Sequence, residues 1–228
     1  DTKSGAIIFD GGSSSEDQVG RYRILPYMKY LGYQKIQIAV ISHMDIDHYS
    51  GIRELLEMGK IKYLGLPEIP KDETMKKIIG IAKKRGTTIF YLSRGRQITT
   101  KDGSLKVLHP QKNSQMEKNA ASLVMQGKIL GYRVLLTGDV EKEGEEELLS
   151  EELERADILK AAHHGSKNST SNEFLQKVQP KQTVISCGKQ NRYGHPHLET
   201  IHRLQTYRTK IYRTDRSGAI IFFKRRDG

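Results

Sequence analysis

Two histidines and two aspartates lie within six residues of one another, directly after an apolar segment. The apolar residues 38–41 lead into a segment in which His43, Asp45, Asp47 and His48 follow in close succession. Imidazole nitrogens and carboxylate oxygens are common protein ligands of divalent cations, and four in one tight loop exceed what a helix cap or a polar turn requires. This HxDxDH spacing therefore predicts a site for divalent metal ions.

Two further apolar segments end in residues of the same kind. Residues 133–137 are followed by a glycine and Asp139, and residues 158–162 are followed by His163 and His164. Each has an ordinary alternative, since Gly-Asp is common in turns and paired histidines can simply end a strand. Three apolar segments that all end in metal-type ligands favour one shared metal site over coincidence.

The segments that must position these residues alternate between strand and helix patterns. Short apolar and β-branched runs predict strands at residues 6–9, 36–42, 61–66, 88–92, 105–108, 122–126, 133–137, 158–161, 183–187, 211–213 and 219–223. Amphipathic patterns predict helices at residues 21–31, 50–58, 73–84, 143–153, 171–178 and 198–206. The strand-rich middle differs from a doubly wound nucleotide-binding fold, and it predicts a mixed α/β chain with two stacked sheets and helices outside.

Composition limits the class of protein. The chain has 228 residues, of which 36% are hydrophobic and 29% are charged, and it has no apolar run near the roughly 18 residues that cross a bilayer. We expect one domain, because α/β folds of this length are commonly single. The chain starts at Asp1 without a methionine, and we expect it to be a piece excised from a longer protein.

The charge balance favours a polyanionic partner. Lys and Arg number 38 against 27 Asp and Glu, a net charge of +11, which suits nucleic acid or an anionic membrane surface, although an ordinary basic protein is the alternative. The lone Cys187 excludes an intramolecular disulfide and a cysteine-based zinc site.

Six segments in chain order resemble the metallo-β-lactamase superfamily and, more closely, the soluble C-terminal domain of ComEC-type competence proteins, which take part in DNA uptake. They are IFDGG at 8–12, SHMDIDH at 42–48, NAASLV at 119–124, LTGD at 136–139, LKAAHHGS at 159–166 and NRYGHP at 191–196. The resemblance implies a single hydrolase domain over residues 1–228 with a four-layer αββα sandwich. It also implies two divalent metal ions, a DNA partner, no nucleotide cofactor, and a bacterial membrane-embedded parent that carries this soluble domain on the extracellular side.

Carried over by motif position, the resemblance implies the metal ligands. The first ion would be held by His43 and Asp45. The second ion would be held by Asp47, His48 and His164, and Asp139 would bridge the two ions. His164 is preferred over His163 as the ligand because it is followed by Gly165, as the last histidine of the superfamily usually is.

The resemblance also places residues around the metal ligands. Asp10 is expected to hydrogen bond a ligand and orient it. His163 and His195 are expected to act on the substrate beside Asp47, with Ser166 nearby to help stabilise phosphate charge. The alternative for His163 is to hydrogen bond a metal ligand and orient it. A purely structural turn residue is the alternative for His195.

This chain departs from the pattern of the superfamily at the first metal. Asp45 stands where a histidine is common, and the separate third histidine is missing, with residues 119–122 in its region. His109 is a candidate substitute for that histidine, but its His-Pro context favours a core or turn residue. Asp102 and the acidic residues 141–154 are further candidate ligands, but the acidic run is interpreted as a solvated helix face. An oxygen-rich site favours manganese, with zinc or magnesium as alternatives.

These inferences lead to three hypotheses about function. Two metal ions roughly 3.5–4 Å apart can hold a hydroxide and clamp the attacking and leaving oxygens of a phosphodiester, which suits a nuclease acting on DNA during competence-related uptake. The alternatives are a small-molecule or cell-wall phosphodiesterase, such as a phosphorylcholine esterase, and a non-catalytic DNA-binding domain. The sequence leaves the oligomeric state open.

Overall fold

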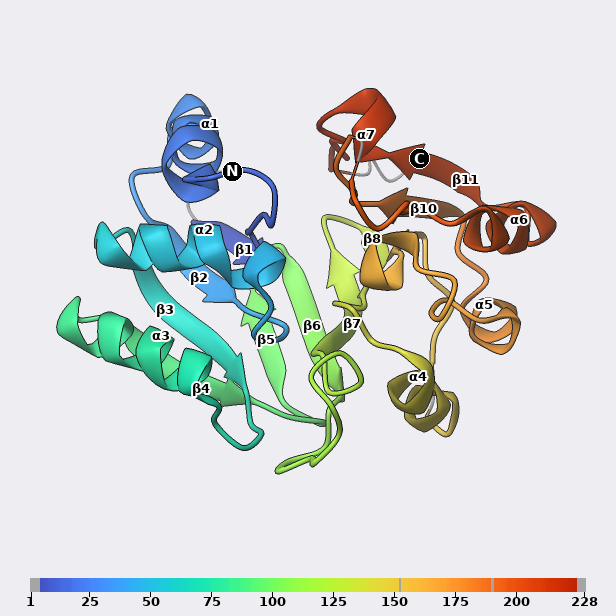
Figure 1. The fold of residues 1–228 in the computed structure, drawn as a ribbon, viewed down its shortest axis with the longest axis horizontal. Helices are drawn as coiled ribbons and strands as arrows, with labels where there is room; N and C mark the ends of the chain where they lie inside the picture. The colour runs from blue at the N-terminus through green and yellow to red at the C-terminus, as the bar shows by residue number, and fades with distance from the viewer. Residues whose placement is uncertain (1–4, 152, 190, 225–228) are drawn as a thin grey trace. The chain divides into compact units, whose positions relative to one another are not determined.

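The computed structural model describes residues 5–151, 153–189 and 191–224. The chain forms two compact units (Figure 1). Unit 1 consists of Asp1–Leu92 and Gln111–Lys118, and unit 2 consists of Ser93–Pro110 and Asn119–Gly228. The expectation of a single domain stays a prediction. In the described part of the chain, no helix has the length and apolar character that crossing a membrane requires.

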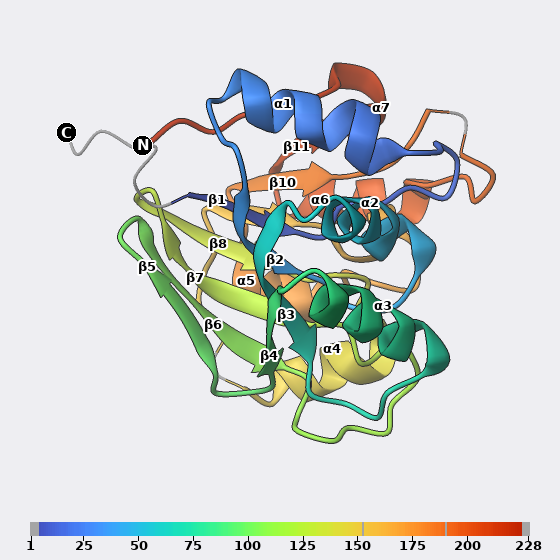
Figure 2. The same ribbon diagram turned by 90° about the vertical axis from the view of Figure 1, so that its left-hand side faces the viewer.

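Unit 1 contains a four-stranded sheet in which all neighbours are parallel. In spatial order the strands are β1 (Ala6–Phe9), β2 (Ile36–Val40), β3 (Ile61–Pro67) and β4 (Thr88–Leu92). The connecting helices are η1 (Gly20–Ile24), α1 (Leu25–Tyr30), α2 (Ile46–Glu57) and α3 (Glu73–Lys84). Because parallel crossovers are right-handed and the strands are added in chain order, the helices lie along one face of the sheet (Figure 2).

The helices of unit 1 form where apolar residues recur at helical spacing. In α3, Met75, Ile78 and Ala82 are buried, whereas the lysines between them are exposed. The helix begins after Asp72, whose side chain accepts a hydrogen bond from the backbone N–H of Met75 at 2.7 Å. The buried face of α3 joins residues of α1, α2, β2 and β3 in one core.

Unit 2 contains a seven-stranded sheet. Its strands are β5 (Gln97–Thr100), β6 (Gly103–His109), β7 (Val124–Ile129), β8 (Tyr132–Leu136), β9 (Ile158–Lys160), β10 (Gln182–Ile185) and β11 (Lys210–Arg213). Strands β5 to β8 form an antiparallel meander, and β9, β10 and β11 are added parallel to β8. The helical segments are α4 (Lys142–Leu149), η2 (Ala162–Gly165), α5 (Asn172–Val178), α6 (Leu198–Thr206) and α7 (Thr214–Ser217).

The core of unit 2 forms where α4, α5 and α6 pack against its sheet. Phe174 of α5 is fully buried, in one cluster with Leu148 of α4 and Leu204 of α6. Leu135 and Leu159 contribute the facing side chains from β8 and β9. The predicted mixed α/β fold with two sheets flanked by helices is confirmed.

Several predicted boundaries were wrong. Residues 219–223 were expected to form a strand but lie outside the strands, with Phe223 78% exposed. Strand β5 was not predicted, because its sequence QITT is largely polar and only Ile98 is buried. The helix α2 begins at Ile46 instead of residue 50, so the metal-ligand motif extends into its first turn.

A close backbone approach joins α2 to the segment that follows β1. The backbone N–H of Gly11 donates to the carbonyl oxygen of His48 at 2.9 Å. A methyl group at Gly51 would collide with the carbonyl oxygen of Gly11 and lie 3.1 Å from the backbone nitrogen of Gly20. Only glycine at position 51 therefore allows the segment after Asp10 to lie directly against α2.

We expect Gly51→Ala to lower the free energy of unfolding by about 1–3 kcal/mol, because a clash with backbone atoms cannot be relieved by moving a side chain. Gly80 is the matched control, since it lies in the middle of α3 and a Cβ there would meet open space. Gly80→Ala should raise the free energy of unfolding by about 0.5–1 kcal/mol. Urea denaturation measures both, and equal stability of the two variants would contradict the close approach.

Candidate metal centre

The ligand-type residues of unit 1 lie at the carboxyl ends of two neighbouring parallel strands. Asp10 directly follows β1, while His43 and Asp45 lie in the loop after β2. Asp47 and His48 lie in the first turn of α2, where the helix dipole favours a negative charge. One ligand atom of Asp47 and one of His48 lie within 4.8 Å of each other, as do one of His43 and one of His48.

The Asp10 carboxylate connects the loop after β2 to α2. Its Oδ1 accepts the backbone N–H of Ser42 at 2.7 Å, and its Oδ2 accepts the hydroxyl of Ser42 and Nδ1 of His48, both at 2.8 Å. Burial raises the pKa of the Asp10 carboxyl, but the neighbouring His48 ring and these hydrogen bonds hold that pKa below its ordinary value. An ionised Asp10 places the proton of His48 on Nδ1 and leaves the lone pair of Nε2 for a cation.

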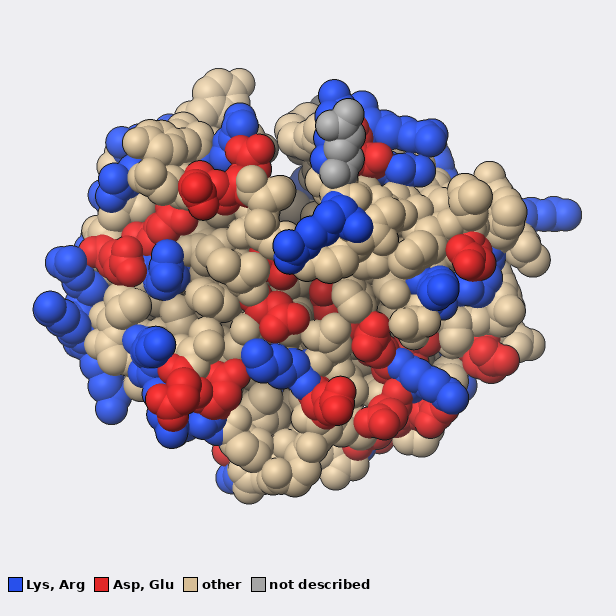
Figure 3. Space-filling model, in the orientation of Figure 1, with Lys and Arg blue, Asp and Glu red and all other residues tan. Residues whose placement is uncertain are grey.

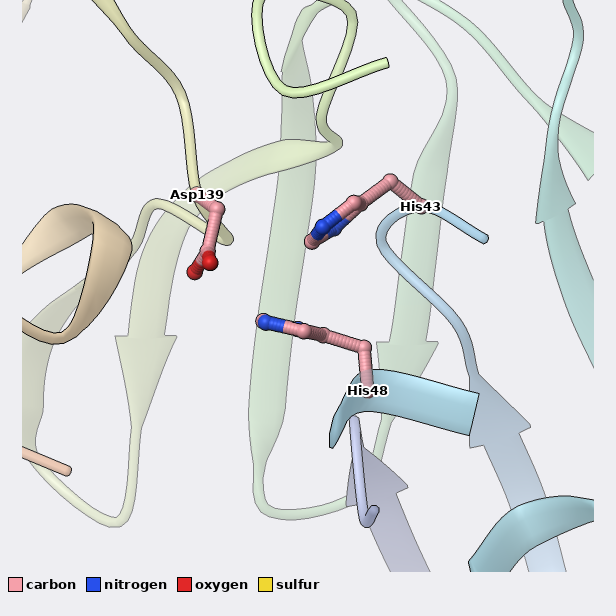
Figure 4. A group of neighbouring side chains, drawn as sticks. All are labelled: His43, His48 and Asp139. Atoms are coloured by element: carbon pink, nitrogen blue, oxygen red, sulfur yellow. The ribbon is translucent and has the colours of Figure 1, made fainter. Parts of the chain in front are cut away.

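His43 packs against His48 and is almost completely buried. The two ring centroids are 4.1 Å apart, and Figure 4 shows the rings side by side. Within the described residues, Nε2 of His43 has no hydrogen-bond partner, and it lies 3.6 Å from Oδ2 of Asp45. A buried polar nitrogen without a hydrogen bond is costly, and a bound cation would satisfy it.

Asp45 carries a negative charge beside this nitrogen. The His43 ring next to it, more than Lys118, holds the pKa of the Asp45 carboxyl below its ordinary value, although burial opposes the shift. Nζ of Lys118 lies 3.7 Å from Oδ1 of Asp45 and 3.9 Å from Oδ2 of Asp72. The donor set of unit 1 therefore combines imidazole with ionised carboxylate, which fits a divalent cation of intermediate hardness.

The ligand-type residues of unit 2 follow another pair of parallel neighbours, β8 and β9. Asp139 comes three residues after the end of β8 and is buried (Figure 4). Its Oδ2 lies 3.2 Å from Nε2 of His164 and 4.0 Å from Nε2 of His163. Its Oδ1 lies 3.4 Å from Nζ of Lys160, which also donates to the carbonyl oxygen of Gly138 at 2.7 Å.

The two histidines of unit 2 are held in an uncommon backbone conformation. The φ angles of His163 and His164 are 44° and 53°, and that of Gly165 is 83°. Non-glycine residues in the left-handed region cost on the order of 1–3 kcal/mol each and concentrate at functional sites. Nδ1 of His163 donates to Glu141 at 2.7 Å and Nδ1 of His164 donates to the carbonyl oxygen of Ser186 at 2.7 Å, so both rings present Nε2 towards Asp139.

His195 lies in a cluster of imidazole rings. Its ring centroid is 5.3 Å from that of His163, 6.2 Å from that of His164 and 4.8 Å from that of His197. Burial, followed by the neighbouring His163, His197 and His164, lowers the pKa of His195 to about 4. The ring is therefore neutral near pH 7. Ser166 is buried, and its Oγ accepts the backbone N–H of Asn168 at 3.3 Å, a contact within its own turn.

The structure places the predicted residues in two groups. His43, Asp45, Asp47, His48 and Asp10 lie together in unit 1, whereas Asp139, His163, His164 and His195 lie together in unit 2.

No supporting role was predicted from the sequence for five residues. They are Ser42, Lys118, Glu141, Lys160 and His197. Ser42, Glu141, Lys160 and His197 lie within three residues of recognised motif residues, and this proximity was the available signal. Lys118 carried no such signal.

The acidic residues after Asp139 correct one sequence interpretation. They were expected to form a solvated helix face, but Glu141 contacts His163, and Glu145 is 3% exposed. The Glu145 carboxylate accepts the backbone N–H groups of Thr170 and Ser171, which fixes the start of α5 after the histidine turn. Part of this run therefore supports the cluster of unit 2.

His109 is a core residue, as its sequence context indicated. It is fully buried, its Nε2 donates to the carbonyl oxygen of Ala120 at 2.6 Å, and its Nδ1 lies 2.7 Å from Glu147. Both ring nitrogens are thus engaged within unit 2.

Comparison with known proteins gives three findings. The profile of the metallo-beta-lactamase superfamily matches residues 1–189. ComE operon protein 3 of Bacillus subtilis is 38% identical over 216 residues, which are 92% of this chain and 27% of that protein. Competence protein ComA of Neisseria gonorrhoeae is 30% identical over 97% of this chain and 30% of its own length. The predicted relationship to competence proteins is confirmed, and the chain spans less than a third of these relatives.

A solved structure supports the fold. The metallo-beta-lactamase fold protein YhfI from Bacillus subtilis superposes with a TM-score of 0.59 and 14% identity, covering 93% of this chain and 86% of that chain.

We expect Asp10→Asn to lower the affinity for Mn²⁺ about 10–100-fold, the usual effect of removing a partner that orients a ligand. An amide is a weaker acceptor than a carboxylate, and its NH₂ group would oppose the proton on Nδ1 of His48. Isothermal titration calorimetry measures the affinity. Asp17→Asn removes the same charge from an exposed position and should bind Mn²⁺ as the unmodified chain does. Equal affinities of the two variants would contradict the role given to Asp10.

Proposed function

The chain belongs to the metallo-beta-lactamase superfamily, and from that premise we propose that it hydrolyses phosphodiester bonds of DNA with two divalent metal ions. The observation that carries this proposal is the repeated arrangement of the two clusters. In each unit, two neighbouring parallel strands are followed by histidine and aspartate side chains. In each unit, Nδ1 of one histidine is held by a hydrogen bond, which leaves Nε2 of that ring for a cation.

We propose that the two clusters hold one pair of ions together. The ligands would be His43 and Asp45 for one ion, Asp47, His48 and His164 for the other, and Asp139 as the bridge. The superfamily match covers residues 1–189 and so includes all six of these residues, which supports this assignment. When bound, such ions supply Lewis acidity and lower the pKa of water, which is the chemistry that phosphodiester hydrolysis requires.

The residues around the proposed ligands fix the orientation of the ligand side chains. Asp10 accepts a hydrogen bond from Nδ1 of His48, and the carbonyl oxygen of Ser186 accepts one from Nδ1 of His164. Each ring is therefore fixed in orientation and tautomer. Lys160 balances the negative charge of Asp139, and Lys118 balances part of that of Asp45. These contacts keep positive charge beside the carboxylates and fix the proton of each ring on Nδ1, so that Nε2 is the nitrogen left to bind a cation.

His163 is suited to move a proton. Glu141 accepts the Nδ1 proton of His163 and stabilises the ring when it is charged, so Nε2 can deliver a proton to the leaving oxygen. The neutral His195 ring packs against it and can donate a hydrogen bond to a phosphate oxygen. Asp47 would act as a metal ligand, and Ser166 shapes the turn that carries His163.

DNA as the substrate is supported by charge and by the relatives. The net charge is +11, and two relatives are named as competence proteins. On the face drawn in Figure 3, Lys and Arg side chains are interspersed with Asp and Glu. Dispersed positive charge supports weak binding of the phosphate backbone without sequence preference. We further propose that the chain is the extracellular part of a longer membrane protein. Its span of less than a third of these relatives supports the longer parent.

Hydrolysis of a small phosphodiester is the alternative, because the Asp and Glu side chains among the basic ones in Figure 3 would repel a long phosphate backbone more than a single phosphate. The two proposals differ in their dependence on salt. Each phosphate of single-stranded DNA that the protein neutralises adds about −0.7 to the slope of log affinity against log salt, whereas a small diester adds little. A non-catalytic DNA-binding domain is less favoured, because Asp47, His48, Asp139 and His164 are all present.

We expect Mn²⁺ to activate cleavage of single-stranded DNA more than Zn²⁺, since Asp45 makes the first site rich in oxygen. Asp139→Asn should reduce the rate of cleavage by more than about a hundredfold. Removing a metal ligand should lower activity more than removing a residue that only orients a ligand, which costs about 10–100-fold. Gel analysis of a labelled oligonucleotide measures both effects. Asp102→Asn, between β5 and β6, is the control and should cleave normally.

Cleavage that is maximal with zinc would contradict the ligand chemistry proposed for the first site. A protein that hydrolyses bis(p-nitrophenyl) phosphate but leaves DNA intact, with salt-independent turnover, would replace the DNA proposal with the small-phosphodiester one.

A further inference from the structure

We propose that a cavity within unit 1 binds the nucleobase next to the phosphodiester that is cleaved. This inference rests on the proposed DNA substrate and adds the site that holds the strand. The cavity is lined by residues of the loop after β2, the segment before α3 and residues 114–118. All of these lie within unit 1.

The size and lining of the cavity suit one planar ring system. Its volume is about 180 Å³, below the roughly 300–1,000 Å³ of sites that take drug-sized molecules. Most of its lining is apolar, with Met44, Met75, Met116, Ile69 and Pro70 as the apolar residues. A single nucleobase, which is planar and has two apolar faces, fits a cavity of this size and lining.

The cavity adjoins the proposed metal ligands. His43 forms part of its lining, and the same ring packs against His48 at a centroid distance of 4.1 Å. Lys118 also lines it, with a side chain that is 57% exposed and an ammonium group 3.7 Å from Asp45. A base in the cavity would therefore place its own phosphate near both the metal ligands and a positive charge.

The methionines indicate an aromatic guest of variable shape. Thioether sulfur makes favourable contacts with aromatic rings, and the unbranched methionine side chain adapts to different neighbours. Met44, Met75 and Met116 supply three such side chains. Ser114 and Gln115 line the same cavity and can hydrogen bond to the polar edge of a base, which an alkyl chain would leave unsatisfied. A methionine-lined cavity can thus accept each of the four bases, as a nuclease without sequence preference requires.

The test uses two single-stranded oligothymidylates that differ at one position, where one strand carries an abasic nucleotide. The rate of cleavage at each phosphodiester is read from a gel with the metal-loaded chain. We expect one bond beside the abasic nucleotide to be cut about tenfold more slowly than the same bond in the complete strand, because stacking of one base contributes on this scale. The other bonds of the strand serve as internal references.

Met116→Ala tests whether this cavity is responsible. The side chain is partly exposed in a loop, so its loss leaves the core of unit 1 intact. The variant should cut the complete strand about tenfold more slowly and should cut the bond beside the abasic nucleotide at an unchanged rate. Met116→Leu, which keeps the apolar volume, should restore most of the difference. Met58→Ala removes a methionine outside the cavity and should keep the full abasic effect.

Uniform cleavage of both strands by the unmodified chain would overturn the inference and leave the nuclease function standing. An abasic effect that persists in Met116→Ala would overturn it as well, because the base would then bind elsewhere. Uniform cleavage that dodecylphosphocholine inhibits competitively would assign the cavity to an alkyl chain instead. Failure to cut either strand with manganese, magnesium or zinc would overturn the proposed DNA function, and the inference with it.

Discussion

The hydrogen bonds of the Asp10 carboxylate are the interaction on which the arrangement of unit 1 depends. They join the end of β1 to the loop after β2 and to the first turn of α2, both of which lie more than 30 residues from Asp10 in sequence. The join is possible because parallel strands end at the same edge of a sheet and because Gly51 lets the segment after Asp10 lie against α2. Burial makes these hydrogen bonds costly to lose. One ionised carboxylate thus fixes the loop that carries His43 and Asp45 and the orientation of His48.

In unit 2, the backbone conformation orients the histidine rings. Two successive histidines and a glycine adopt left-handed φ angles after β9, which turns both imidazole rings towards the carboxylate that follows β8. Two hydrogen bonds stabilise this strained conformation: Nδ1 of His163 donates to Glu141, and Nδ1 of His164 donates to the carbonyl oxygen of Ser186. Buried Glu145 fixes the chain beyond the turn by accepting two backbone N–H groups. Both units therefore place imidazole nitrogens next to carboxylate oxygens, which are the donor atoms that bind divalent cations.

The sequence predicted the residue types at strand ends better than the contacts that hold them. His48 and Asp139 were recognisable because each follows an apolar strand within a spaced motif. Lys118 could not be recognised, since its approach to Asp45 depends on how a loop more than 70 residues away returns to the sheet. Glu141 and Glu145 were misassigned because an acidic helix usually faces solvent, and the burial of the single Glu145 carboxylate does not change the helical periodicity of the sequence. Strand β5 was missed because pairing with β6, and not apolar content, stabilises its polar sequence.

Electron paramagnetic resonance of the manganese-loaded chain tests most directly our proposal that the two clusters hold one pair of metal ions. Two Mn²⁺ ions at the roughly 3.5–4 Å of a two-metal site are exchange-coupled and give a multiline spectrum. We predict this spectrum at two equivalents of metal, and its loss in both Asp47→Ala and Asp139→Ala, one from each unit. A simple six-line spectrum of isolated ions at full loading, unchanged by Asp139→Ala, would contradict the claim.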